Sequence, residues 1–83
     1  MSEVGHDLHA LFPGEASHLH ALKVESGPYR GLAERHHLLS REIARIESGL
    51  DAASDERLEE LKKQRLGLLD EVAAMIAERK GKK

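Results

Sequence analysis

Six histidines are the side chains of this 83-residue chain that could bind a metal ion. His6 and His9 are spaced to lie on adjacent turns of a helix, and His18 and His20 flank a leucine. A zinc site needs three or four ligands at defined spacing, and the chain contains no HExxH motif. We therefore expect surface histidines that respond mildly to pH, with no metal and no cofactor.

Lys62, Lys63 and Arg65 form a basic run that could bind the phosphates of a nucleic acid. Projected on a helix, Lys63 lies outside the apolar face, Lys62 at its margin and Arg65 near its centre. Acidic residues three and four positions before Lys63 suit ion pairs within the helix. The favoured interpretation is therefore a set of solvated, paired side chains. The alternative is a nucleic-acid-associated protein that uses Lys62, Lys63 and the basic C-terminal tail RKGKK.

Neither the residue types nor their spacing predict catalysis. The chain has no cysteine, so it has no thiolate nucleophile and no disulfide. It also has no nucleophile paired with a base at a recognisable spacing and no glycine-rich phosphate loop. We expect no catalytic residues and no enzyme activity.

Composition limits the classes of partner. The chain has 13 basic and 15 acidic side chains, and this net charge of -2 argues against a general polyanion binder. Phe12 and Tyr29 are the only aromatic residues, which leaves no stacking platform for single-stranded nucleic acid. No apolar run approaches the roughly 20 residues of a membrane span, and the first residues lack the features of a secretion signal. We expect a soluble cytoplasmic protein.

Two prolines and the stretch SGLDAAS divide the sequence into helical segments of one domain. Proline is well tolerated at the first helical position, so Pro13 and Pro28 predict where two helices begin. The predicted helices span residues 13–25, 28–50 and 55–80.

Ser54 is the predicted N-cap of the last helix, because a serine before an acidic first turn satisfies a free backbone N–H. The segment before Phe12 could add a short helical turn. Residues 1–5 and 81–83 are expected to be disordered, as chain ends commonly are.

Apolar residues recur in both long helices at alternating intervals of three and four, which predicts a heptad seam. The pattern includes His36 and ends at Leu50 in the first helix, and it includes Arg65 in the second. A second apolar row makes the face of the second helix broader than a two-stranded seam needs. The predicted interface residues are Leu32, His36, Leu39, Ile43, Ile46, Leu58, Leu61, Arg65, Leu68, Leu69, Val72 and Ile76.

The predicted fold is all-α, with a short N-terminal helix followed by a long, coiled-coil-like antiparallel hairpin, because a short loop makes neighbouring helices antiparallel. Counting from the loop places Ile43 near Leu61 and Leu32 near Val72. A bare hairpin leaves half of each broad face open, so we expect the N-terminal helix, a second chain or both to cover it. Self-association is expected, most simply as a dimer.

Two polar residues lie within the predicted seam. His36 is expected to be partly buried, with one ring nitrogen reaching a carboxylate or water. Arg65 is expected to pack its stem on leucines and to extend its guanidinium to the edge, where Glu42 is the predicted partner. Polar groups in such seams often select register and partner at some cost in stability.

Three stretches resemble a known family: HDLHALFP at residues 6–13, RHHLLSREIARIE at 35–47 and LKKQRLGLLDEV at 61–72. They are similar to the YdcH family, small bacterial proteins whose domain has no known function. The resemblance covers about residues 6–78. It implies a coiled-coil-like helical fold, and it assigns no catalytic residue or ligand to this chain.

The helical pattern and the composition together predict a non-enzymatic protein–protein interaction or regulatory module. Such a module would act as a homo-oligomer and would bind an unknown protein partner by helix packing. The sequence names neither that partner nor the biological process.

Overall fold

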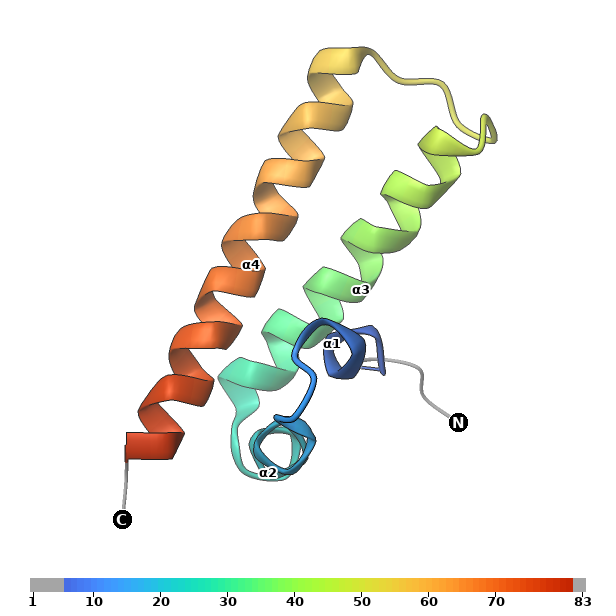
Figure 1. Ribbon diagram of the computed structural model, residues 1–83. Coiled ribbons are helices and arrows are strands. Elements are labelled where there is room, and N and C mark those ends of the chain that lie inside the picture. The colour runs from blue at the N-terminus through green and yellow to red at the C-terminus, as the bar shows by residue number, and fades with distance from the viewer. Residues whose placement is uncertain (1–5, 82–83) are drawn as a thin grey trace.

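Four helices make up the part of the chain that the structure, a computed structural model, describes, which is residues 6–81 (Figure 1). Their bounds are α1 His6–Leu11, α2 Ala16–Glu25, α3 Gly27–Glu47 and α4 Asp55–Gly81. No strand occurs in residues 6–81, so the all-α prediction is confirmed. Of the segments predicted to be disordered, residues 1–5 and 82–83 lie outside the described residues, whereas Gly81 is the last residue of α4.

Helices α3 and α4 lie side by side and form the antiparallel hairpin that the sequence predicted (Figure 1). At the start of α3 the Ser26 hydroxyl accepts a hydrogen bond from the Tyr29 amide at 3.1 Å, and Pro28 occupies the first turn. At the start of α4 the Ser54 hydroxyl accepts one from the Arg57 amide at 3.0 Å, which confirms the predicted cap. Both long helices therefore begin at a serine that satisfies a backbone N–H with no intrahelical partner.

Helix α3 ends at Glu47, before the predicted end at Leu50. Gly49 has a φ of +85°, a left-handed conformation that stops the helix and that L side chains rarely adopt. The amides of Leu50 and Asp51 then donate to the Arg45 carbonyl at 2.9 and 3.2 Å, which closes the turn. Leu50 is 70% exposed, so its predicted place in the seam is wrong.

Helix α2 begins at Ala16 and not at Pro13 as predicted. Pro13 and Gly14 instead belong to the turn between α1 and α2, where Gly14 has a φ of +86°. The Glu15 amide donates to the Phe12 carbonyl at 3.1 Å across this turn. Because a left-handed residue cannot belong to the first turn of an α-helix, the helix starts after it. Helix α1 is the short helical segment expected before Phe12.

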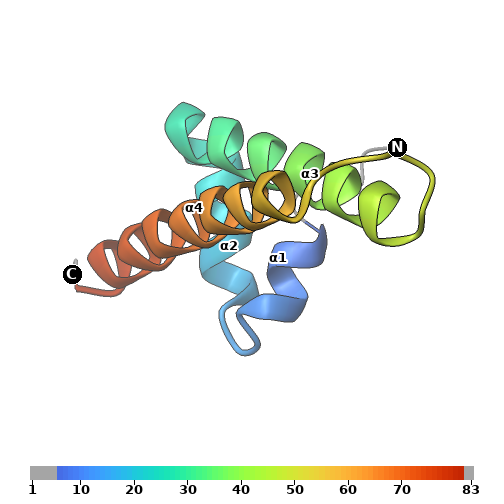
Figure 2. The same ribbon diagram turned by 90° about the horizontal axis from the view of Figure 1, so that it is seen from above.

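Helices α1 and α2 pack on one side of the hairpin, near the end away from the loop (Figure 2). We call this end the base and the opposite end the loop end. Fully burying a leucine is worth about 1.5–3 kcal/mol, so the buried side chains at the base are the main source of stability. The N-terminal helices thus cover part of the apolar face within the same chain. The main core consists of Leu8, Leu19, Leu22, Tyr29, Ala33, Val72 and Ile76.

Candidate interaction surface

The predicted interface residues lie along the seam between α3 and α4 of a single chain. Those that are buried are His36, Ile43, Leu61, Leu68, Val72 and Ile76. Those that are partly buried are Leu32, Leu39, Ile46, Leu58, Arg65 and Leu69. Leu32 packs against the main core, which also contains its predicted neighbour Val72. The part that these residues play in contacts between chains stays a prediction.

Two ion pairs join α3 to α4 at the loop end. The Arg57 guanidinium lies 3.6 Å from the Glu42 carboxylate, and the Lys62 ammonium lies 3.0 Å from the Glu47 carboxylate. Glu42 and Glu47 are about 140° apart around α3, so the two pairs lie on opposite sides of the seam. In the register predicted from the loop, Arg57 lies nearer to the loop than the α4 residue level with Glu42, and Lys62 lies farther from the loop than the α4 residue level with Glu47. The two displacements are equal in length and opposite in direction, so the two ion pairs together agree with that register.

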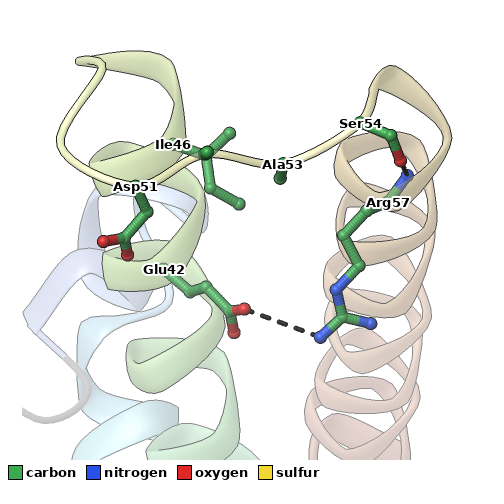
Figure 3. Close-up of a pocket in the computed structure, with 7 residues that line it drawn as sticks. Glu42, Ile46, Asp51, Ala53, Ser54 and Arg57 are labelled. Carbon is green, nitrogen blue, oxygen red and sulfur yellow. Dashed lines mark hydrogen bonds and ion pairs between the residues drawn. The ribbon is translucent and has the colours of Figure 1, made fainter.

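The predicted ion pair between Arg65 and Glu42 is wrong. Glu42 pairs with Arg57 instead, as Figure 3 shows, and Arg65 forms no ion pair within residues 6–81. Arg65 lies about 12 Å farther from the loop than Arg57 along α4, so it is level with Leu39 and not with Glu42. Its side chain is partly buried in the seam, as expected if its stem packs against the leucines.

A hollow of about 380 Å³ lies beneath the loop, between α3 and α4 (Figure 3). Glu42 and Arg57 face each other across it, and Ile46 points into the space between the helices. The Glu42 carboxylate is paired with Arg57, and the Asp51 carboxylate is paired with Arg45. The hollow therefore presents paired charges and not a free acid beside a free base. Its lining residues are Glu42, Ile46, Asp51, Ala52, Ala53, Ser54 and Arg57.

Asp51 fastens the loop to α3. Its carboxylate accepts hydrogen bonds from Arg45 Nε at 2.9 Å and from Arg45 Nη2 at 3.2 Å. These hydrogen bonds, together with the attraction between the charges, lower the pKa of Asp51 and raise the pKa of Arg45. The pair is therefore charged at neutral pH, and its two-point geometry fixes the path of the loop.

Two further ion pairs connect α2 to the C-terminal end of α4 at the base. Arg79 Nη1 lies 2.7 Å from Glu25 Oε1, and Lys80 Nζ lies 3.0 Å from Glu15 Oε2. These cations begin the basic tail that the alternative prediction assigned to nucleic acid. Both are engaged with carboxylates of the same chain, and the lysines at 82 and 83 lie outside the described residues.

The basic run on α4 does not form one patch. Lys62 pairs with Glu47 of α3 and not within its own helix, and it is partly buried. Lys63 is exposed and forms no ion pair with any described residue, so its expected intrahelical pairing is wrong. Glu60 instead accepts a hydrogen bond from Gln64 at 3.4 Å. The two lysines therefore face different surroundings.

The histidines occupy different environments. His36 is 2% exposed, so it is more deeply buried than predicted. His9 and His20 are exposed, His18 is partly buried, and the side chain of His6 lies outside the described side chains. Among the described residues, no three of the types that usually bind metals form a group that could hold an ion.

Sequence reasoning did not identify the roles of Tyr29 and Arg30. Tyr29 is 2% exposed and belongs to the main core. Arg30 Nη1 donates to the carbonyls of Lys23 at 2.8 Å and Val24 at 3.3 Å, which satisfies acceptors at the C-terminal end of α2. A signal was available for Tyr29, because its spacing of four from Ala33 places both side chains on one side of α3.

Among residues 6–81, no helix covers much of the side of the hairpin opposite α1 and α2, and we call this side the open face (Figure 2). Tyr29 points into the main core, and Glu42 lies about 140° from it around α3. Glu42 and its partner Arg57 therefore mark the opposite side. Leu38 lies there and is 56% exposed. By helical periodicity, the open face includes Gly31, Arg35, Leu38 and Glu42 of α3 and Arg57, Gln64, Gly67 and Glu71 of α4.

None of the helices in residues 6–81 is long and apolar enough to cross a membrane.

Comparison with known proteins identifies the hairpin as the matching part of this chain. A family model described as a protein of unknown function, DUF465, matches residues 30–76, which span most of α3, the loop and most of α4. No curated protein and no solved structure matches the chain. Because the matched residues make up more than half of the chain, this protein belongs to the DUF465 family of proteins of unknown function.

Proposed function

We propose that the protein is a non-enzymatic helical interaction module that acts as a homo-oligomer, most simply a dimer, and binds a further protein by helix packing. The observation that carries the proposal is that α1 and α2 cover one side of the hairpin at its base. The open face keeps an exposed leucine, Leu38, beside the partly buried seam residues Leu39 and Ile46. Apolar side chains left open on a small helical protein favour association.

The size of the chain supports this proposal. A chain of 83 residues can bury only a small core, and such domains commonly gain stability from a second copy. An interface that buries Leu38 would add to the apolar area removed from water.

The absence of enzyme activity is part of the proposal. It is supported by the roles of the charged side chains at the two ends of the hairpin, which join helices to one another or hold the loop. We also propose that the protein acts in the cytoplasm, because a chain without cysteine needs no oxidising compartment. The three stretches that resemble the YdcH family lead us to infer that its relatives are proteins of that type.

Analytical ultracentrifugation over a wide range of concentration tests the homo-oligomer. We expect the mass to rise from that of a 9.2 kDa monomer to twice that value as concentration increases. A protein that keeps the monomer mass at every concentration, and unfolds with a midpoint that does not depend on concentration, would contradict the proposal.

A further inference from the structure

We propose that two copies of this chain meet through the open face, with α3 of each copy packed against α4 of the other. This inference rests on the proposed homo-oligomer and adds to it the face, the orientation and the contacts. It depends on three features of the hairpin: the charged side chains that have no ion-pair partner within residues 6–81, the leucine that projects from α3, and the glycine at the same level on α4.

The charged side chains that form no ion pair within residues 6–81 differ in sign between the two long helices. On α4 the cations without an ion pair within residues 6–81 are Lys63 and Arg65. On α3 the cations without an ion pair within residues 6–81 are Arg30, Arg35 and Arg41, and the one such carboxylate is Glu34. On the open face, α3 therefore presents the cation of Arg35 and α4 presents the carboxylate of Glu71. The carboxylates of α4 that form no ion pair in the described part of the chain are Asp55, Glu56, Glu59, Glu60, Asp70, Glu71 and Glu78.

This difference in charge selects one symmetry for a dimer. A twofold axis parallel to the long helices packs α3 of each copy against α4 of the other. The dimer then has two such contacts, and the two helices run antiparallel at each of them. A twofold axis across the hairpin would place α3 on α3 and α4 on α4, which brings like charges together. Attraction in the first arrangement and repulsion in the second favour the parallel axis.

Leu38 of one copy and Gly67 of the other are complementary in shape in this arrangement. In the register fixed by the ion pairs at the loop end, Leu38 of α3 is level with Gly67 of α4, within about one residue or 1.5 Å. A Cβ at Gly67 would have no atom within 4 Å, so the glycine leaves space on the open face. The twofold axis brings Leu38 of each copy over Gly67 of the other, where the leucine side chain fills that space.

Arg35 and Glu71 give the same arrangement a charged contact. Both side chains are exposed, and neither forms an ion pair with the described residues of its own chain. Their levels along the hairpin differ by about two residues, or 3 Å. The twofold axis places Arg35 of each copy beside Glu71 of the other, so the dimer contains this pair twice.

Charge reversal tests the contact directly. Arg35→Glu and Glu71→Arg should each raise the dimer Kd about tenfold, because each puts like charges together at two places. An equimolar mixture of the two single variants should associate as tightly as the unchanged protein, because opposite charges meet again at both contacts. This recovery requires that residues 35 and 71 meet between chains and not within one chain. Arg41→Glu and Asp70→Arg make matched charge changes away from the open face and should leave the Kd unchanged.

Gly67→Leu tests whether Leu38 of one copy packs over Gly67 of the other. It should raise the dimer Kd by about tenfold or more while the helix itself becomes more stable, because leucine favours a helix more than glycine does. Leu66→Asp, on the side of α4 that carries Lys62, should leave the Kd unchanged. Ultracentrifugation measures all these constants. A monomeric parent protein would overturn the homo-oligomer itself. A parent dimer whose Kd is the same in Arg35→Glu, Glu71→Arg and Gly67→Leu would overturn only the choice of face.

Discussion

The two ends of the hairpin differ in how many apolar side chains they bury. At the base, α1 and α2 bury Leu8 and Leu19 completely against the long helices. At the loop end, Ile43 and Leu61 are buried in the seam, and α3 and α4 are also joined by ion pairs whose side chains remain 38–52% exposed. A buried leucine is worth about 1.5–3 kcal/mol, whereas an exposed ion pair contributes about 0.2–1 kcal/mol. The base, which buries more side chains, therefore provides most of the stability, and the ion pairs at the loop end mainly set how the two helices align.

Truncating a core leucine should have the largest effect on the base. Leu19→Ala should lower the free energy of unfolding by about 2–5 kcal/mol, because it removes a fully buried side chain and leaves a cavity. Urea denaturation followed by circular dichroism measures the change. Val24→Ala is the matched control in the same helix, where the side chain is 66% exposed, and should change stability by less than about 0.5 kcal/mol. Equal losses in the two variants would contradict the assignment of the core.

The left-handed glycine of the loop should have the next largest effect. Gly49→Ala should cost about 1–2 kcal/mol, because its φ of +85° is strained for any residue with a Cβ. Hydrogen exchange should show the lost protection mainly at the end of α3 and the start of α4. Gly67→Ala is the control, since this helical glycine has open space around it, and should instead raise helix stability by up to about 1 kcal/mol. A loss of protection at the base larger than that at the loop end would refute the separation of the two ends.

The ion pair between Glu47 and Lys62 should have a small effect that depends on salt. A double-mutant cycle with Glu47→Gln and Lys62→Met should give a coupling energy of about 0.2–1 kcal/mol. The coupling should decline as salt is added, because both side chains are partly exposed. A coupling that is unchanged by salt would show that the loop end is held in some other way.

Acid should loosen the loop through Asp51. The pKa of its carboxyl is lower in the folded chain than in the unfolded chain. The stability that the pairing of Asp51 with Arg45 contributes is therefore present above the unfolded pKa and is lost as pH falls through the folded pKa. Arg45→Gln should raise the pKa of Asp51 toward its ordinary value, which NMR titration of the carboxyl measures. Arg41→Gln, which removes a charge from the same helix, should leave it unchanged. An Asp51 pKa that does not respond to Arg45→Gln would exclude this pairing in solution.

The hairpin was predictable from sequence because it depends on local periodicity. Leu39 and Ile43 recur at an interval that places them on one side of α3, and tertiary contacts do not change such intervals. Leu61 and Leu68 are spaced in the same way on α4. The cap at Ser54 was predictable for the same reason, since it involves residues three positions apart.

Features that depend on single dihedral angles or on distant contacts were not predictable. The early end of α3 depends on the φ of Gly49, and the late start of α2 depends on the φ of Gly14. The partner of Glu42 depends on which long side chain on α4 reaches the seam at that level, and this is Arg57 and not Arg65. The position of α1 and α2 depends on contacts with residues far along the chain, which no local pattern records.

The composition of the main core also constrains how the protein is made. Leu8 and Leu19 are synthesised before Val72 and Ile76, with which they pack. The N-terminal helices therefore cannot complete their packing until residue 76 has been added and has emerged from the ribosome. Until then their leucines remain exposed, and a nascent chain that stalled at the loop would present them to chaperones or to other chains.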